Sequence, residues 1–250
     1  MVPAASDLDA RDEQARLAEL YLRSTRYIAV LAVPLTLYAM ASADLLVRVL
    51  FAGQDHLDQA AWVARILLAG YLANLLPGPG MSIALGKGRA EMAMYAGLIS
   101  TGANLVLTVT FVVAACTGGL TETPTVYLVA AATALSLLIS TAWFFRALRR
   151  HVDVAPGRLL RTSLLWPTLA SAPGTAACLA AAWWLRTAEG RLENLAAALA
   201  GAAVFGLGYG LVLRAAPYLD AFDIHFLEQT LGLGRVPGFR RLVGGRARRG

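Results

Sequence analysis

Charged residues are scarce in this sequence. Asp, Glu, Lys and Arg make up 15% of the 250 residues, whereas an average soluble domain contains about 25%. Hydrophobic residues make up 58%, and the mean hydropathy is +0.58. The apolar residues lie in long blocks instead of being spread along the chain. The composition therefore excludes an ordinary water-soluble domain and predicts a protein that crosses the lipid bilayer.

Cysteine and histidine are also rare. The two cysteines, Cys116 and Cys178, lie in or near apolar blocks, and the three histidines stand far apart at positions 56, 151 and 225. Their spacing fits neither a disulfide framework nor a metal site. The sequence also lacks HExxH, GxSxG and Walker motifs. We therefore expect no enzyme activity, no metal ion and no cofactor.

Six apolar blocks are long enough to cross the hydrocarbon core. A spanning helix needs about 20 mostly apolar residues, and it satisfies its own backbone hydrogen bonds. The blocks are continuous and rich in Ala and Leu, without the alternation of barrel strands. The sequence thus predicts an all-α, polytopic membrane helical bundle of about six transmembrane helices. The blocks run from about Tyr27 to Leu46, Ala61 to Leu85, Met92 to Ala115, Thr125 to Phe145, Ser163 to Leu185 and Leu195 to Leu213.

Two charged segments flank this transmembrane domain of residues 27–213. Residues 1–26 are charged rather than apolar, so we expect no signal peptide. We interpret them as a cytoplasmic amphipathic segment that lies at the membrane interface, with a solvated helix as the alternative. Residues 214–250 end in a cluster of six arginines. They predict a basic cytoplasmic tail that anchors the chain or contacts anionic headgroups.

Lys and Arg fall on alternate connections between the blocks. With the N-terminus in the cytoplasm, eighteen of the 22 Lys and Arg residues lie inside, three lie outside, and Arg65 lies within a block. Such an asymmetry follows the positive-inside rule. It predicts a multi-pass protein of the cell membrane with both termini in the cytoplasm. The same distribution accounts for the net charge of +6, so we expect no nucleic-acid partner.

Two charged residues stand inside apolar blocks. Asp44 lies near the outer end of the first block and Arg65 near the outer end of the second. A charge at the centre of a span costs about 2.5–3.5 kcal/mol, but a side chain near an end can reach the interface. We therefore prefer independent snorkelling of the two side chains. The alternative is an Asp44–Arg65 ion pair between neighbouring helices.

Two asparagines complete the polar residues of interest. Asn74 lies in the second block and Asn104 in the third. An amide side chain can hydrogen-bond across helices, a contact worth about 0.6–2 kcal/mol. We prefer this role to contact with a substrate, and we keep Arg65, Asn74, Asn104 and Asp44 as candidates for a substrate path.

Proline and glycine interrupt the helical pattern at two places. Pro34 should kink the first helix, and Pro77, Gly78, Pro79 and Gly80 break the second. Irregular backbone at membrane depth is tolerated where it lines a cavity or is buried in protein, and the sequence leaves both readings open. Later in the chain, the small-xxx-small pair at positions 206 and 210 favours close packing of the last helix on another helix, either within the chain or between molecules.

Several segments resemble one family of membrane transporters. They are similar to the spanning helices of polysaccharide and lipid-linked oligosaccharide flippases in the MOP exporter superfamily, which includes the MviN/MurJ-like and Wzx-like flippases. The similarity is carried by the P-x-x-S pattern at Pro3–Ser6, LLVRVLFAGQ at Leu45–Gln54, RILLAGYLANLLPGPGMSIALGKGR at Arg65–Arg89 and GANLVLTV at Gly102–Val109.

The resemblance implies a function and a set of partners. It implies an all-α fold that works by alternating access, and a chain that corresponds to the later part of such a flippase. The cargo would be an undecaprenyl-linked saccharide, driven by an ion gradient or the membrane potential, with a separate chain supplying the missing N-terminal helices. The alternatives are a non-transporting partner subunit, a truncated inactive fragment, or a membrane enzyme. An enzyme would need a cluster of Asp, Glu or His at one membrane face, which the sequence lacks.

Overall fold

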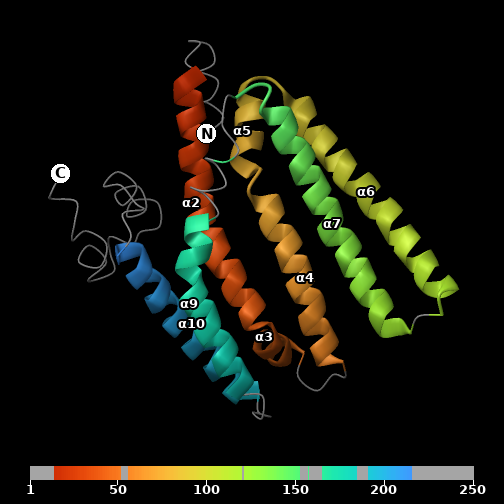
Figure 1. The fold of residues 1–250 in the computed structure, drawn as a ribbon, viewed down its shortest axis with the longest axis vertical. Coiled ribbons are helices and arrows are strands. Elements are labelled where there is room, and N and C mark those ends of the chain that lie inside the picture. Colours follow the sequence, from red (N-terminus) through yellow and green to blue (C-terminus); the bar gives the residue numbers. More distant parts are fainter. Residues whose placement is uncertain are drawn as a thin grey trace.

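The computed structural model describes residues 14–51, 56–119, 121–152, 157, 165–184 and 191–215. The regular elements within these ranges are helices, which confirms the predicted all-α bundle. The helices, shown in Figure 1, are α2 (Gln14–Ala41), α3 (Ala43–Leu50), α4 (Leu57–Leu75), α5 (Gly78–Gly86), α6 (Ala90–Thr117), α7 (Glu122–Leu148), α9 (Trp166–Trp184) and α10 (Arg191–Ala215).

Five helical segments in the described part are long and apolar enough to cross a membrane. The fifth predicted crossing, at about 163–185, coincides with α9, which is not one of the five. Its 19 residues rise about 28 Å, close to the thickness of the hydrocarbon core. A crossing by α9 therefore stays a prediction. The five segments are Ala15–Ala41, Leu57–Gly86, Ala90–Thr117, Pro124–Leu148 and Leu192–Val212.

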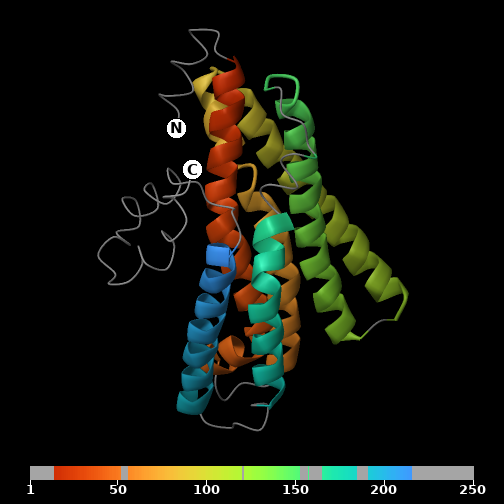
Figure 2. The same ribbon diagram turned by 60° about the vertical axis from the view of Figure 1, so that its left-hand side comes forward.

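The long helices run alternately up and down the bundle. In Figures 1 and 2, α9 and α10 lie against the lower half of α2, while α6 and α7 form a pair on the other side of the molecule. Helix α4 packs against both α2 and α7 and so joins the two groups. The short helix α3 lies beneath the end of α2 and contacts α4 and α10. This arrangement places the α2–α3 corner beside the beginning of α4.

The largest core cluster lies at the end of the bundle where α2 begins. Leu17 and Tyr21 of α2 are buried there against Ile83 of α5 and against Phe144 and Leu148 of α7. Helix α2 continues without a break past residue 26, where the sequence analysis ended the N-terminal segment. In this part of the predicted interfacial segment, the apolar face therefore packs on protein. Residues 1–13 and the basic tail from residue 216 lie outside the described residues.

Glycines allow close approaches at positions that the sequence did not single out. A Cβ atom at Gly70 of α4 would lie 2.7 Å from Cα of Ala134 in α7, and one at Gly174 would lie 2.8 Å from the ring of Phe205. In contrast, no atom of the described chain lies within 4 Å of a Cβ at Gly206 or Gly210. An internal close contact at that glycine pair is therefore not found among the described residues, and an intermolecular contact stays a prediction.

Candidate functional site

The break in the second spanning segment separates α4 from α5. Helix α4 ends at Leu75 and α5 begins at Gly78, because Pro77 and Pro79 have no backbone N–H to continue the first helix. Both proline side chains are fully buried. A Cβ at Gly80 would lie 2.7 Å from Leu148 Cδ2 and 2.9 Å from Phe144 Cε1, so only a glycine fits there without movement. On this side the break is therefore buried in protein.

The opposite side of the same region is open. Asn74 is exposed, as are Tyr71 and Leu75 on the last turns of α4. Arg65 stands nine residues before Asn74, which is half a turn out of phase in a helix of 3.6 residues per turn. The two side chains therefore leave α4 in opposite directions, and the structure does not bring these two candidates together.

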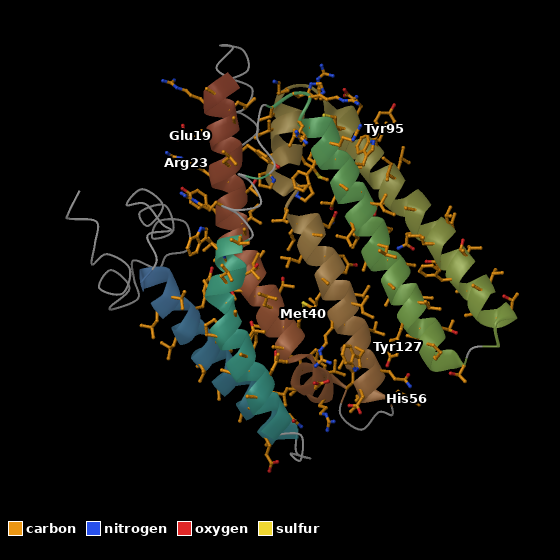
Figure 3. All side chains as sticks on the ribbon, viewed as in Figure 1. Glu19, Arg23, Met40, His56, Tyr95 and Tyr127 are labelled. Atoms are coloured by element: carbon orange, nitrogen blue, oxygen red, sulfur yellow. The ribbon has the colours of Figure 1, made fainter. Side chains whose placement is uncertain are left out.

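Asp44 and Arg65 form an ion pair. Arg65 Nη2 lies 2.6 Å from Asp44 Oδ2, and the two side chains are only 17% and 25% exposed. The preferred sequence interpretation, independent snorkelling, is therefore wrong, and the alternative is confirmed. Arg65 also donates from Nε to the backbone carbonyl of Met40, at 3.0 Å. Figure 3 places Met40 beside α3, at the end of α2 opposite Glu19 and Arg23.

The α2–α3 corner positions the partners of Arg65. Helix α2 ends at Ala41, and Ser42 closes the turn with a hydrogen bond from its hydroxyl to the Tyr38 carbonyl, at 2.7 Å. Met40 thus supplies a carbonyl at the negative end of α2, and Asp44 lies in the first turn of α3. The Arg65 cation is favourable at the C-terminal end of α2 and pairs with the Asp44 carboxylate at the beginning of α3, so Arg65 joins α2, α3 and α4.

Trp62 is a further contact of Arg65. The guanidinium carbon lies 4.9 Å from the centroid of the Trp62 ring, which is cation–π geometry. Trp62 is not among the residues that the sequence predicted for this site. The sequence contains a signal for this contact, because Trp62 and Arg65 are three residues apart and residues three apart on a helix lie on one face. A nearby second pair, Arg48–Asp58, has a 3.4 Å contact and an exposed Asp58 side chain, so it contributes little.

Asn104 lies in a separate polar network between α6 and α7. Its amide nitrogen donates to the Thr133 hydroxyl, at 3.1 Å, and its amide oxygen accepts from the Thr108 hydroxyl, at 3.1 Å. These bonds agree with the preferred reading of Asn104 as a contact between helices. The network is distinct from the Asp44–Arg65 pair, so the candidate residues occupy separate places.

We expect Asn104→Leu to destabilise the protein by about 1 kcal/mol, because it removes the bond between α6 and α7. Thr108→Val should cost less, since its hydroxyl bonds within its own helix. The midpoint of thermal unfolding of the purified chain in one detergent measures both effects. Equal losses for the two variants would contradict an interhelical role for Asn104.

Basic side chains gather at the bundle end that holds the start of α2. Lys87 Nζ donates to the His151 backbone carbonyl, at 3.2 Å, which ties the α5–α6 turn to the end of α7. Partial burial lowers the pKa of His151, and the positive charges of Arg89, Lys87 and Arg150 lower it further. His151 is therefore neutral at pH 7, and the positive charge of this end comes from Lys and Arg.

The side chains that commonly bind metal ions do not cluster in the described part of the chain. No group of three or more His, Cys, Asp or Glu residues there could hold a metal ion. The polar contacts instead join helices, at the α2–α3–α4 corner and between α6 and α7.

Comparison with known protein families gives a match over most of the chain. A family model described as "Lipid II flippase MurJ" matches residues 1–192. No match is found among curated proteins or among solved structures. The matched region contains all the candidate residues.

Proposed function

Because this chain belongs to the lipid II flippase MurJ family, which lies within the MOP superfamily, we propose that it moves a lipid-linked saccharide precursor across the cell membrane. The observation that carries this proposal is the family match over residues 1–192. The bundle of apolar helices is consistent with it, since such a cargo must pass along or through a protein in the bilayer. An undecaprenyl-type lipid carrying a sugar is the cargo that we propose.

We also propose that both termini lie in the cytoplasm. Lys87, Arg89, Arg146 and Arg149 are at the bundle end where α2 begins, and positive side chains favour the cytoplasmic face. The opposite end holds the Asp44–Arg65 pair, which would then lie toward the outside. Residues 1–26 and 214–250 would be the two cytoplasmic segments.

Asn74 is the best candidate for direct contact with the cargo. Its side chain is exposed on α4 next to the helix break, and an amide can both donate to and accept from sugar hydroxyls. The charge of Arg65, in contrast, is already engaged by Asp44 and by the Met40 carbonyl. We therefore propose Asn74 as a path residue and the Asp44–Arg65 pair as a support that shapes the outer end.

Reconstituted vesicles test this function. The purified chain is incorporated with a fluorescent undecaprenyl-linked saccharide, and a membrane-impermeant quencher reports how much label becomes accessible from outside. We expect the wild-type chain to raise the accessible fraction over protein-free vesicles. Asn74→Leu should reduce the rate at which the label becomes accessible. It should not lower the melting temperature, because the Asn74 side chain is exposed.

Thr110→Val is the matched control for Asn74→Leu. Thr110 is an exposed polar residue of α6, and its hydroxyl bonds to the Val106 carbonyl of its own helix. This variant should transport as the wild type does. A folded chain that leaves the label distribution unchanged would contradict transport by this chain and favour the partner-subunit alternative. Equal rates for Asn74→Leu and wild type would remove Asn74 from the path.

A further inference from the structure

Pro34 leaves one backbone carbonyl of α2 without its usual partner. In an α-helix the N–H of residue i bonds to the carbonyl of residue i−4, and proline has no N–H. Helix α2 nevertheless continues through Pro34 to Ala41. The freed carbonyl belongs to Val30, which is only 3% exposed. At membrane depth an unpaired backbone group is costly, so a donor from another element is needed.

Tyr209 of α10 supplies that donor. Its hydroxyl lies 2.8 Å from the Val30 carbonyl oxygen, across 179 residues of sequence. Its ring stacks on Phe205, with the centroids 6.5 Å apart and the planes 18° apart. Phe205 in turn packs on Gly174 of α9 and on Tyr38 of α2. The hydroxyl is thus held at the end of an aromatic row that joins α2, α9 and α10.

The same arrangement recurs at a second proline. Pro77 has no N–H for the Ala73 carbonyl of α4, and the Thr141 hydroxyl of α7 lies 3.4 Å from that oxygen. Thr141 is 8% exposed, so this contact is also inside the bundle. Two proline-freed carbonyls on different helices therefore each have a hydroxyl from a neighbouring helix beside them.

We infer that Tyr209 is a positioning residue whose hydroxyl replaces the N–H missing at Pro34 and thereby fixes where α10 seats on α2. Thr141 has the same role for α4 and α7 at Pro77, with a longer and weaker bond. The position of α10 on α2 is specific because a carbonyl in the interior of a helix otherwise accepts an N–H of its own helix, whereas the Val30 carbonyl cannot. A shift of α10 along α2 would leave the Val30 carbonyl unpaired. This inference does not depend on the transport proposal.

Tyr38 provides an internal contrast. Its hydroxyl donates in the reverse direction, from α2 to the Ala198 carbonyl of α10. Residue 202, four positions beyond Ala198, is an alanine inside α10, so its N–H already satisfies that carbonyl. Removing the Tyr38 hydroxyl therefore leaves a backbone acceptor that still has a partner. Removing the Tyr209 hydroxyl leaves one that has none.

A double-mutant cycle tests the inference on the full chain in one detergent. Tyr209→Phe keeps the ring and removes the donor, and it should lower the midpoint of thermal unfolding by about 5 °C. Tyr38→Phe, the matched control, should lower it by much less. Pro34→Ala restores the N–H at residue 34, so Tyr209→Phe made in that background should lose most of its effect. Thr141→Val should show the same dependence on Pro77→Ala, with a smaller shift.

The cycle distinguishes a specific donor from general packing. An equal loss for Tyr209→Phe with proline or alanine at position 34 would overturn the inference, as would equal losses for Tyr209→Phe and Tyr38→Phe. If Tyr209→Phe does not accumulate in membranes, the amount of the Pro34→Ala/Tyr209→Phe protein in the membrane tests the inference instead. Recovery of its amount to that of Pro34→Ala alone supports the inference, and no recovery contradicts it.

Discussion

Arg65→Gln is expected to destabilise the folded chain by about 2–3 kcal/mol. Losing one partner of a fully buried ion pair costs about 3–5 kcal/mol, because the other charge is left desolvated. The two side chains here keep 17% and 25% of their surface, so the remaining charge retains some hydration and the cost is lower. The variant also loses the bond to the Met40 carbonyl and the contact with the Trp62 ring.

Asp44→Asn should cost less than Arg65→Gln. Without the carboxylate, Arg65 keeps the Met40 carbonyl and the Trp62 ring, and an asparagine oxygen can still accept its hydrogen bond. Without the guanidinium, the Asp44 carboxylate has lost the donor that lies 2.6 Å from it. The asymmetry therefore follows from the number of groups that each side chain contacts.

Thermal or denaturant unfolding of the purified variants measures this asymmetry. Arg48→Gln is the matched control, because Arg48 pairs with an Asp58 side chain that is 83% exposed and should contribute less than 1 kcal/mol. In the Asp44→Asn/Arg65→Gln double variant, the loss should be smaller than the sum of the single losses. If Arg65→Gln is no more harmful than Arg48→Gln, the pair does not hold the α2–α3–α4 corner.

The sequence predicted the fold class because long apolar blocks indicate helices that are surrounded by lipid. It offered the Asp44–Arg65 pair only as the alternative, since the contact depends on where α3 lies beneath α2, and a break of one residue at Ser42 decides the direction of α3. Leu17 and Tyr21 have the spacing of one helix face, but spacing does not say whether lipid headgroups or α5 and α7 cover that face.

Glycine positions show the same limit of prediction from sequence. A small-xxx-small pattern indicates that a helix permits close approach, yet the partner must be supplied by the rest of the fold. Gly206 and Gly210 have the pattern and have open space around them among the described residues. Gly70 has no such pattern and lies directly against Ala134. The prolines behave alike: the sequence reveals the freed carbonyls, but only the packing reveals Tyr209 and Thr141 beside them.

Gly70→Ala is expected to destabilise the chain by about 2–3 kcal/mol. The added Cβ would lie 2.7 Å from Cα and 2.9 Å from Cβ of Ala134, closer than real Cβ atoms approach other atoms. Because the nearest atom is backbone, rotation of a side chain cannot relieve the overlap, and α4 and α7 must separate. Overpacking of a tight core typically costs about 1–3 kcal/mol. The effect should lie at the upper end because α4 joins the two groups of helices.

Two further variants identify the cause. Gly102→Ala in α6 adds the same methyl group where no described atom lies within 4 Å, so it should be neutral or slightly stabilising through helix propensity. Ala134→Gly in the Gly70→Ala background removes only the 2.9 Å contact with the Ala134 Cβ and leaves the 2.7 Å contact with its Cα, so it should recover little of the lost melting temperature. Full recovery in this double variant would contradict the backbone contact with Ala134 as the cause of the loss.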